Sequence, residues 1–335
     1  MSFNIQKLCG RLPVEIGGRL PLFPKHDAVG MRISVITQVL NRIDFIEDAI
    51  RSVRSQAGVR IEHIIVDGGS TDGTLERLKQ LSDIILISAS NLGSYESMNR
   101  GLQEANGEIV CFLSSDDTLP DNALLRVSKI FEKESNLAAI CGEADVFIKL
   151  KGYEKIVARI IHASDDRDFF DEILFGAPAI NTWFFRRSIL PASCFDIRWT
   201  LSADRNFLLK AWLDGLRPKR IHDVLYRYCQ HPSSNTLDEA QRMGPKILAE
   251  HAKLSAEWMM YENLNVRHRG RIRYWHAWEN TCHAVQLAKQ GQSLDATKAL
   301  LRAWARSPML PLYALQARNI IRGHIRKFSK SAAAT

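Results

Sequence analysis

Long hydrophobic runs are absent from this chain of 335 residues. No apolar stretch approaches the roughly 20 residues that a membrane-spanning helix needs. Residues 1–30 also lack the continuous apolar segment of a secretory signal peptide, because Glu15, Gly17, Arg19 and Pro21 interrupt it. We therefore expect neither a membrane-spanning protein nor one that a signal peptide exports.

Cysteines are few and widely scattered. The six of them show none of the close paired spacings of zinc sites. Cys111 and Cys141 lie in apolar, strand-like segments, where a thiol behaves as a small hydrophobic side chain. The pattern predicts no structural zinc and a reducing compartment, so we expect a cytoplasmic protein, free or at the inner face of the membrane.

Basic residues are concentrated in the C-terminal third. Residues 242–330 contain 16 Lys and Arg against 5 Asp and Glu, whereas the whole chain has a net charge of +8. Hydrophobic residues in this part follow helical spacing, and residues 275–288 and 294–305 on either side of Gly291 predict a helical hairpin. We expect a basic helical region over residues 239–335.

The end of this region has its own pattern. Residues 312–328 place leucines and isoleucines among Arg318, Arg322, Arg326 and Lys327. A basic amphipathic helix suits an anionic membrane surface, although the pattern fits equally a helix packed on the protein with its charges in water. Nucleic acid is not an expected partner, because no aromatic and basic binding platform accompanies the charge.

Two acidic loops carry the chemistry. Residues 64–74 (IIVDGGSTDGT) and 110–117 (VCFLSSDD) each begin as an apolar run and end in carboxylates. Such runs are typical of buried parallel strands, whose C-terminal edge is where open α/β sheets bind ligands. Adjacent carboxylates such as Asp116 and Asp117 repel each other in a cleft unless a divalent cation or a ligand hydroxyl lies against them. The sequence therefore predicts a ligand site where the two loops meet.

The rest of the chain up to about residue 238 alternates strands and helices, which indicates parallel strands joined by right-handed crossovers. We expect strands at residues 33–37, 61–67, 84–87, 109–113, 138–148, 182–185 and 224–228, and helices at residues 43–56, 74–81, 96–105, 124–134 and 203–213.

These motifs resemble the family 2 glycosyltransferases of the GT-A fold. The resemblance covers about residues 33–236 and rests on the order and spacing of Thr37, Asn41-Arg42, residues 67–74, Asn99-Arg100-Gly101, residues 105–108 and the Ser-Asp-Asp strand end. It implies an α/β fold whose Rossmann-like, mixed and mainly parallel sheet binds a nucleotide-diphospho-sugar, with a helical C-terminal appendage.

The resemblance also implies a division of the chain. We expect an extension over residues 1–30, a GT-A glycosyltransferase domain over residues 31–238 and the basic helical region after it. The extension either covers an edge of the sheet or is a poorly ordered leader or a start-codon misassignment.

Roles for single residues follow from the same resemblance. Asp67 would bind the nucleotide base, because a strand-end carboxylate before two glycines accepts a base N–H, although an Asx-turn or a helix cap is its plainer role. Thr37 would be the second nucleoside contact.

Asp117 would coordinate a divalent cation, Mg²⁺ or Mn²⁺, that bridges the diphosphate, while Asp116 would contact ribose or sugar. The alternative is a pair of solvated turn residues, and Ser114 departs from the Asp or Asn of many relatives.

Asp204 is the candidate general base. It precedes an amphipathic helix at the family's Ala-Asp position, and an inverting transferase needs one carboxylate beside the acceptor hydroxyl. Its alternative role is a helix cap. Asn91 and Asn99 are expected near the sugar or diphosphate of the donor, with helix capping as the alternative. His231 is expected in a loop that covers the diphosphate, and the alternative is a solvated side chain. Ala177 replaces a histidine of many relatives, which argues for an altered acceptor side.

The expected function is a metal-dependent, hexosyltransferase-like inverting glycosyltransferase. Its donor would be a nucleotide sugar and its acceptor a glycan or a lipid-linked molecule in surface polysaccharide assembly. A sugar nucleotidyltransferase is one alternative, but it would carry a Gly-rich phosphate loop after the first strand, where residues 37–41 have none. The other alternative is a non-catalytic nucleotide-sugar-binding subunit of a membrane assembly, which the departures at Ser114, Ala177 and Arg205 make conceivable.

Overall fold

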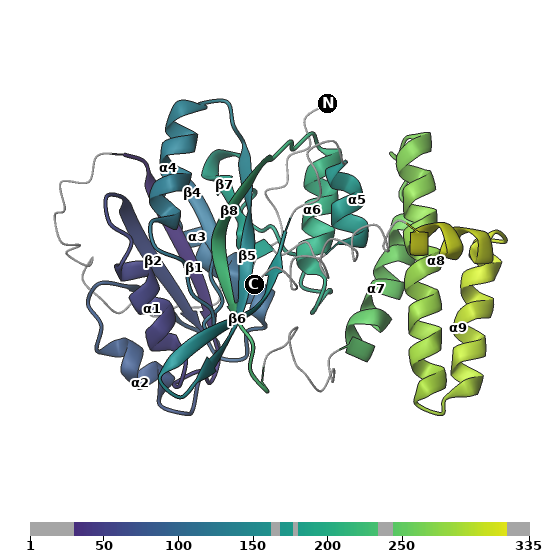
Figure 1. The fold of residues 1–335 in the computed structure, drawn as a ribbon, viewed down its shortest axis with the longest axis horizontal. Coiled ribbons are helices and arrows are strands. Elements are labelled where there is room, and N and C mark those ends of the chain that lie inside the picture. The colour runs from purple at the N-terminus through teal and green to yellow at the C-terminus, as the bar shows by residue number, and fades with distance from the viewer. Residues whose placement is uncertain (1–29, 162–167, 177–179, 234–243, 320–335) are drawn as a thin grey trace.

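The computed structural model describes residues 30–161, 168–176, 180–233 and 244–319. Within these residues one eight-stranded sheet has the order β3-β2-β1-β4-β7-β5-β6, and β8 pairs with β5. Figure 1 shows α5 and α6 between the sheet and the helices α7, α8 and α9, with α9 on the outside. The arrangement is the expected α/β domain followed by helices.

The elements have the following bounds. The strands are β1 (Arg32–Val39), β2 (Arg60–Asp67), β3 (Ile85–Ser88), β4 (Ile109–Phe112), β5 (Ala139–Leu150), β6 (Tyr153–Ile160), β7 (Trp183–Arg186) and β8 (Lys219–Cys229). The helices are α1 (Ile46–Arg54), α2 (Thr74–Lys79), α3 (Ser94–Glu104), α4 (Ala123–Lys133), α5 (Phe169–Phe175), α6 (Ala203–Leu213), α7 (Gly244–Met259), α8 (Val266–Lys289) and α9 (Ser293–Arg306), with short 3-10 turns at Ile180–Thr182 and Arg187–Ile189.

The first half of the sheet is parallel, as expected. β1 pairs in parallel with both β2 and β4, and β2 pairs in parallel with β3. β7 then runs antiparallel to both β4 and β5. The C-terminal ends of β1, β2 and β4 therefore open on the same edge, and this edge carries the two acidic loops.

Helix α3 lies unusually close to β1 because Gly101 has no side chain. A Cβ at this position would lie 2.4 Å from Cγ2 of Ile36, so any larger residue would push the helix away from the strand. The close approach fixes the N-terminal end of α3 beside the end of β1. Ser94 and Tyr95 thereby reach the ligand edge of the sheet.

The core on the α3 face of the sheet extends into the C-terminal helices. Met98 and Leu102 pack on this face, and the same buried cluster continues through Phe207 of α6 to Trp258 of α7 and Trp275 of α8. The regions expected at residues 31–238 and 239–335 thus share one hydrophobic core, which brings α7 to the edge of the candidate site.

The expected helical hairpin is confirmed as α8 and α9. Gly291 forms the turn between them with a positive φ of 77°, and Ala277, Ala303 and Leu310 make a small core of their own. A further helical segment covers residues 310–319, while residues 320–328 of the expected tail, the N-terminal extension up to residue 29 and Ala177 lie outside the described residues. Among the described helices none has the length and low polarity to cross a bilayer.

Candidate active site

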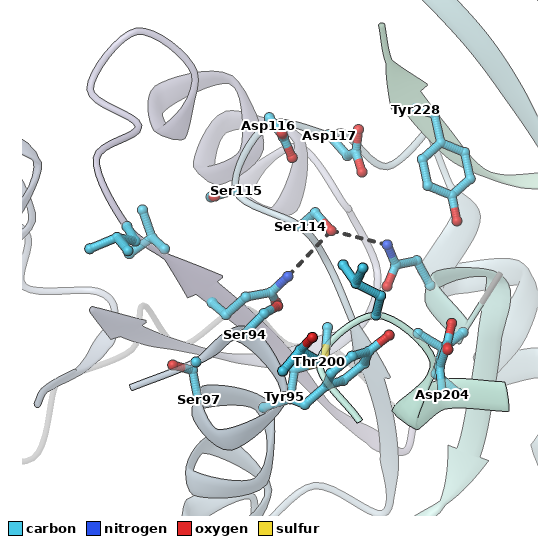
Figure 2. A pocket seen from close by; sticks show the side chains of 18 of the residues that line it. Ser94, Tyr95, Ser97, Ser114, Ser115, Asp116, Asp117, Thr200, Asp204 and Tyr228 are labelled. Carbon is cyan, nitrogen blue, oxygen red and sulfur yellow. Dashed lines mark hydrogen bonds between the residues drawn. The ribbon is translucent and has the colours of Figure 1, made fainter. Parts of the chain in front are cut away.

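A cavity of about 830 Å³ lies at the C-terminal edge of β1 and β4. Its walls come from the end of β1, the start of α3, the loop after β4, the start of α6, the end of β8 and the first turns of α7. Figure 2 shows Asp116 and Asp117 on one side of this cavity, and Asp204 and Tyr95 on another. Three carboxylates, two from the loop after β4 and one from the first turn of α6, therefore face one space.

Two hydrogen bonds from the protein fix the carboxylate of Asp117. Its Oδ2 accepts a hydrogen bond from the hydroxyl of Tyr226 at 2.6 Å, and its Oδ1 accepts one from the backbone N–H of Cys229 at 2.8 Å. Burial, followed by the charge of Asp116, raises the pKa of Asp117 well above its ordinary value. The strand end thus holds a carboxylate whose charge is costly unless a cation compensates it.

Asp116 is more open and faces His231. Nε2 of His231 lies 3.0 Å from Oδ2 of Asp116, and Nε of Arg42 lies 3.7 Å from the same oxygen. The imidazole ring stacks on Phe45 with 4.2 Å between the ring centroids. The loop after β8 therefore carries His231 across to the acidic loop, a distance of 115 positions in the sequence.

Ser114 belongs to a neutral hydrogen-bond network. Its Oγ accepts from Nδ2 of Asn181 at 3.0 Å and from Nε2 of Gln38 at 3.4 Å, the two bonds drawn in Figure 2. Nδ2 of Asn181 also donates to the hydroxyl of Tyr226 at 3.1 Å. Ser114 is thus linked through Asn181 to the tyrosine that binds Asp117.

Asp204 stands at the first turn of α6 and is partly buried. Its Oδ1 accepts from the backbone N–H of Arg205 at 2.7 Å, and Tyr95 forms a side-chain hydrogen bond to the carboxylate. Burial raises the pKa of Asp204 above its ordinary value, and these hydrogen bonds oppose the shift only in part. A carboxylate with a raised pKa that faces a cavity has the properties of a general base.

The two residues after Asp204 serve packing. The guanidinium of Arg205 donates to the backbone carbonyls of Leu174 and of Gly176, the latter at 3.1 Å. Oδ1 of Asn206 accepts from Nε1 of Trp258 at 3.0 Å, which ties α6 to α7. Arg205 and Asn206 therefore hold the start of α6 against α5 and α7.

Thr37 and Asp67 lie behind the cavity wall. Oγ1 of Thr37 is 2.9 Å from Nε2 of His63, and both side chains are buried. Oδ1 of Asp67 accepts from the N–H groups of Gly69 and Ser70, each at 2.9 Å, whereas its Oδ2 is buried without a hydrogen-bond partner among the described residues. Neither residue lines the cavity, so their nucleoside roles stay predictions.

Asn99 and Asn91 do not line the cavity either. The amide of Asn99 is buried and bonds the backbone of Cys194 and Phe195, with Nδ2 donating to the Phe195 carbonyl at 2.7 Å. Asn91 is an exposed turn residue with a left-handed φ of 64°. The residues that α3 presents to the cavity are instead Ser94, Tyr95, Ser97 and Met98.

Helix α7 adds two residues that the sequence did not indicate. Ile247 and His251 line the cavity, and the charge of His251 acts on the pKa of Asp204. Nδ1 of His251 lies 3.4 Å from Oε1 of Glu279, which α8 contributes. Helical periodicity predicts that such residues exist on one face, but not which distant segment that face meets.

Comparison with known proteins identifies the domain. The profile of glycosyl transferase family 2 matches residues 34–191. An uncharacterised glycosyltransferase of Nostoc is 34% identical over 121 residues, which are 35% of this chain and 37% of that protein. TuaG of Bacillus subtilis, named for teichuronic acid biosynthesis, is 41% identical over 90 residues, or 25% of this chain and 36% of TuaG. The matched segments thus span about a third of these curated relatives.

Solved structures share the fold at low sequence identity. Residues 1–349 of TarS from S. aureus have a TM-score of 0.57 and 17% identity over 89% of this chain and 92% of that one. The mannosyltransferase PcManGT from Pyrobaculum calidifontis, solved with GDP-Man and Mn²⁺, has a TM-score of 0.53 and 16% identity over 94% and 90%. Residues 34–191 therefore match glycosyl transferase family 2, and the chain shares the GT-A fold of these solved glycosyltransferases.

Proposed function

We propose that this protein is an inverting glycosyltransferase, which moves a sugar from a nucleotide-sugar donor to a hydroxyl of a glycan or lipid-linked acceptor. The observation that carries the proposal is one cavity with Asp116 and Asp117 on one wall and Asp204 on another. TarS bound to UDP-GlcNAc and PcManGT bound to GDP-Man support a nucleotide sugar as the donor. The name of TuaG supports a place in surface polysaccharide assembly.

Asp204 acts as the general base in this proposal. The acceptor oxygen forms a bond to the anomeric carbon while the bond from that carbon to the diphosphate oxygen breaks. The hydroxyl proton passes to the carboxylate of Asp204, and the nucleoside diphosphate leaves. The pKa of Asp204, raised by burial, makes the carboxylate a better proton acceptor than an exposed aspartate.

A divalent cation, Mg²⁺ or Mn²⁺, fits the acidic loop. Asp116 and Asp117 offer two carboxylates, with the imidazole of His231 paired to Asp116, and the bonds from Tyr226 and Cys229 to Asp117 resemble the outer contacts that orient metal ligands. The described residues contain no cluster of three or more His, Cys, Asp or Glu placed to hold a metal, so phosphate oxygens of the donor would complete the coordination. The cation would neutralise the charge that develops on the leaving diphosphate.

Asp67 remains our candidate for the residue that binds the nucleobase of the donor. Its unpartnered Oδ2 supports this role, because a buried acceptor without a hydrogen bond costs about 1–3 kcal/mol. An N–H of the base would satisfy this oxygen.

Helix α9 supports a membrane surface as an additional partner. Its small residues Ala296 and Ala303 are buried, whereas Leu294, Leu301 and Trp304 are 69%, 54% and 54% exposed. The large apolar side chains thus point away from the protein. A helix that only packs on its neighbours would bury its large apolar side chains and expose its small ones.

The exposed apolar surface continues past α9. Leu312 and Leu315 are about half exposed, and with Leu294, Leu301 and Trp304 they form what we call the outer face. Residues 293–319 contain Asp295 as their one acidic residue and four basic residues, Lys298, Arg302, Arg306 and Arg318. Apolar side chains among basic ones complement an anionic lipid surface, so we propose that the outer face lies on such a membrane.

The products of the reaction distinguish the proposed enzyme from the two alternatives. A sugar nucleotidyltransferase would release pyrophosphate from a nucleoside triphosphate and a sugar phosphate. A non-catalytic subunit would bind a nucleotide sugar and release nothing. The proposed enzyme releases a nucleoside diphosphate.

A panel of nucleotide sugars tests the proposal. Thermal shift with Mn²⁺ and with EDTA finds the donor, and release of nucleoside diphosphate is then measured with and without candidate acceptors. We expect one donor to raise the melting temperature only with the cation, and release that depends on the acceptor. Binding without release in the presence of acceptors supports the non-catalytic subunit instead.

A further inference from the structure

Glu250 of α7 accepts four hydrogen bonds from the turn that leads into α6. Oε2 accepts from the N–H and the hydroxyl of Thr200, at 3.1 and 2.9 Å. Oε1 accepts from the N–H of Leu201 and the hydroxyl of Ser202, both at 2.7 Å. Asp204 follows this turn directly, and Glu250 itself does not line the cavity.

The carboxylate of Glu250 binds the residues just before α6 and accepts a hydrogen bond from the hydroxyl of its N-cap residue. Ser202 is the N-cap residue of α6, but its side chain makes no capping bond to the helix and donates to Glu250 instead. The N–H groups of Thr200 and Leu201 also find their acceptor in a residue about 50 positions further along the chain. The start of α6 is therefore tied to α7 rather than closed on itself.

Helix α7 is itself anchored in the core beside α6. Trp258 is buried and donates to Asn206 of α6 at 3.0 Å, two turns of α7 beyond Glu250. Leu254, between these two residues, is fully buried. Burial alone would raise the pKa of Glu250, yet the bonds from Leu201, Ser202 and Thr200 lower it below the ordinary value, so the carboxylate stays charged.

We propose that Glu250 is a positioning residue, which holds the turn at residues 200–202 so that Asp204 faces the acceptor hydroxyl. The inference rests on the proposed function, because it assumes that Asp204 receives a proton. It gives the C-terminal helices a part in the reaction although their residues lie outside the matched family domain.

Glu250→Gln is the variant that tests the inference. The new amide NH₂ replaces one oxygen and faces a backbone N–H, so the bond from that N–H is lost while the size is kept. Displacing a catalytic group by about 1 Å costs up to about 10²-fold in rate, so we expect kcat to fall by about 10- to 100-fold with the donor KM unchanged. Glu257→Gln is the matched control, because Glu257 lies on the same helix and pairs only with the exposed Arg198 in the described structure.

Hydrogen exchange supplies a second measurement that does not depend on activity. The amides of Thr200 and Leu201 should exchange faster in Glu250→Gln than in the parent and in Glu257→Gln. Parent-like kcat, or parent-like exchange at these amides, overturns the inference. A rise in donor KM with unchanged kcat does the same, because it indicates a role in binding the donor. A parent that transfers no sugar overturns the proposed function, and the exchange rates then decide whether Glu250 holds the turn.

Discussion

Asp117 and Asp204 both have raised pKa values, but different surroundings explain their different proposed roles. Asp117 receives bonds from Tyr226 and Cys229 and lies beside a second carboxylate, which suits the binding of a cation. Asp204, in the first turn of α6, has no carboxylate next to it in the sequence and forms a hydrogen bond with Tyr95, which suits the transfer of a proton. Substitutions at the two residues should therefore change different steps.

Asp117→Asn should weaken donor binding in Mn²⁺ by at least about 10-fold, because the amide is a poor ligand for a hard cation. Asp117→Ala should in addition cost about 1–3 kcal/mol of unfolding free energy, since the Tyr226 hydroxyl loses its acceptor. Titration calorimetry with Mn²⁺ or EDTA and urea unfolding measure the two effects. Asp121→Asn, at an exposed carboxylate in the same loop, is the control. Donor binding that is unchanged and indifferent to EDTA contradicts the metal assignment.

Asp204→Asn should stabilise the protein, and increasingly so as the pH rises. The folded pKa of Asp204 lies above the unfolded value, so the parent gains stability from this group only while the carboxyl is protonated and loses it as the pH passes the folded pKa. Asn stays neutral and keeps the bond from Arg205. Melting temperatures from about pH 4 to about pH 8 should separate as the pH increases. A parent that is more stable than the variant at the alkaline end contradicts the assigned direction.

The acidic residues of the cavity were predictable because strand-end carboxylates have a local pattern. Tyr226 and Asn181 were not, since each reaches Ser114 or Asp117 from 67 or more positions away and has an ordinary strand or loop context. Asn99 was expected near the donor because of its motif, but its amide bonds the backbone at Cys194 and Phe195. Motifs locate a loop, and long-range packing decides which of its side chains point inward.

At the scale of elements, periodicity predicted the strands around β1 and the hairpin of α8 and α9. It missed β6, whose residues are almost all exposed and so have no alternation between buried and exposed positions. It also missed α5, which has only seven residues. The sequence could not predict that α7 and α8 pack on α6, because this packing depends on long-range contacts such as that of Trp258 with Asn206.

Truncation tests whether the sheet and the C-terminal helices share one hydrophobic core. A chain that ends at Pro308 keeps α7, α8 and α9 and should fold and bind the donor. A chain that ends at Met243 loses Trp258 and Trp275, both buried against α5 and α6, and should aggregate or unfold. Losing one large buried aromatic side chain already costs about 3–5 kcal/mol. Circular dichroism and size-exclusion chromatography compare the two, and a well-folded shorter chain contradicts the shared core.

At the scale of the whole molecule, the site and the outer face belong to different parts of the chain. The cavity lies between the sheet and α7, whereas the outer face lies on α9 and residues 310–319. In the proposed arrangement the protein rests through the outer face on a membrane, which is the surface that carries lipid-linked acceptors. The charge of the C-terminal region would strengthen the contact at low salt.

Leu301→Glu with Trp304→Glu should release the protein from vesicles of anionic phospholipid, since two apolar side chains are replaced by repelled charges. Val266→Glu is the control, because Val266 is 91% exposed but lies outside the outer face. Co-sedimentation at low and high salt measures binding. Equal binding of the double variant and the control contradicts a lipid contact at the outer face.

Transfer by Asp204→Asn tests the central claim most directly. The substitution keeps the size of the side chain but removes the proton acceptor, so it should preserve donor affinity while lowering kcat by about 10²–10⁴-fold, the usual effect of a general base. The assay compares acceptor-dependent release of nucleoside diphosphate in parent and variant with the donor that the thermal-shift panel selects. Unchanged donor affinity with this loss of rate is the predicted result. Transfer at close to the parent rate would contradict the assignment of Asp204 as the base and, with it, the mechanism built on this cavity.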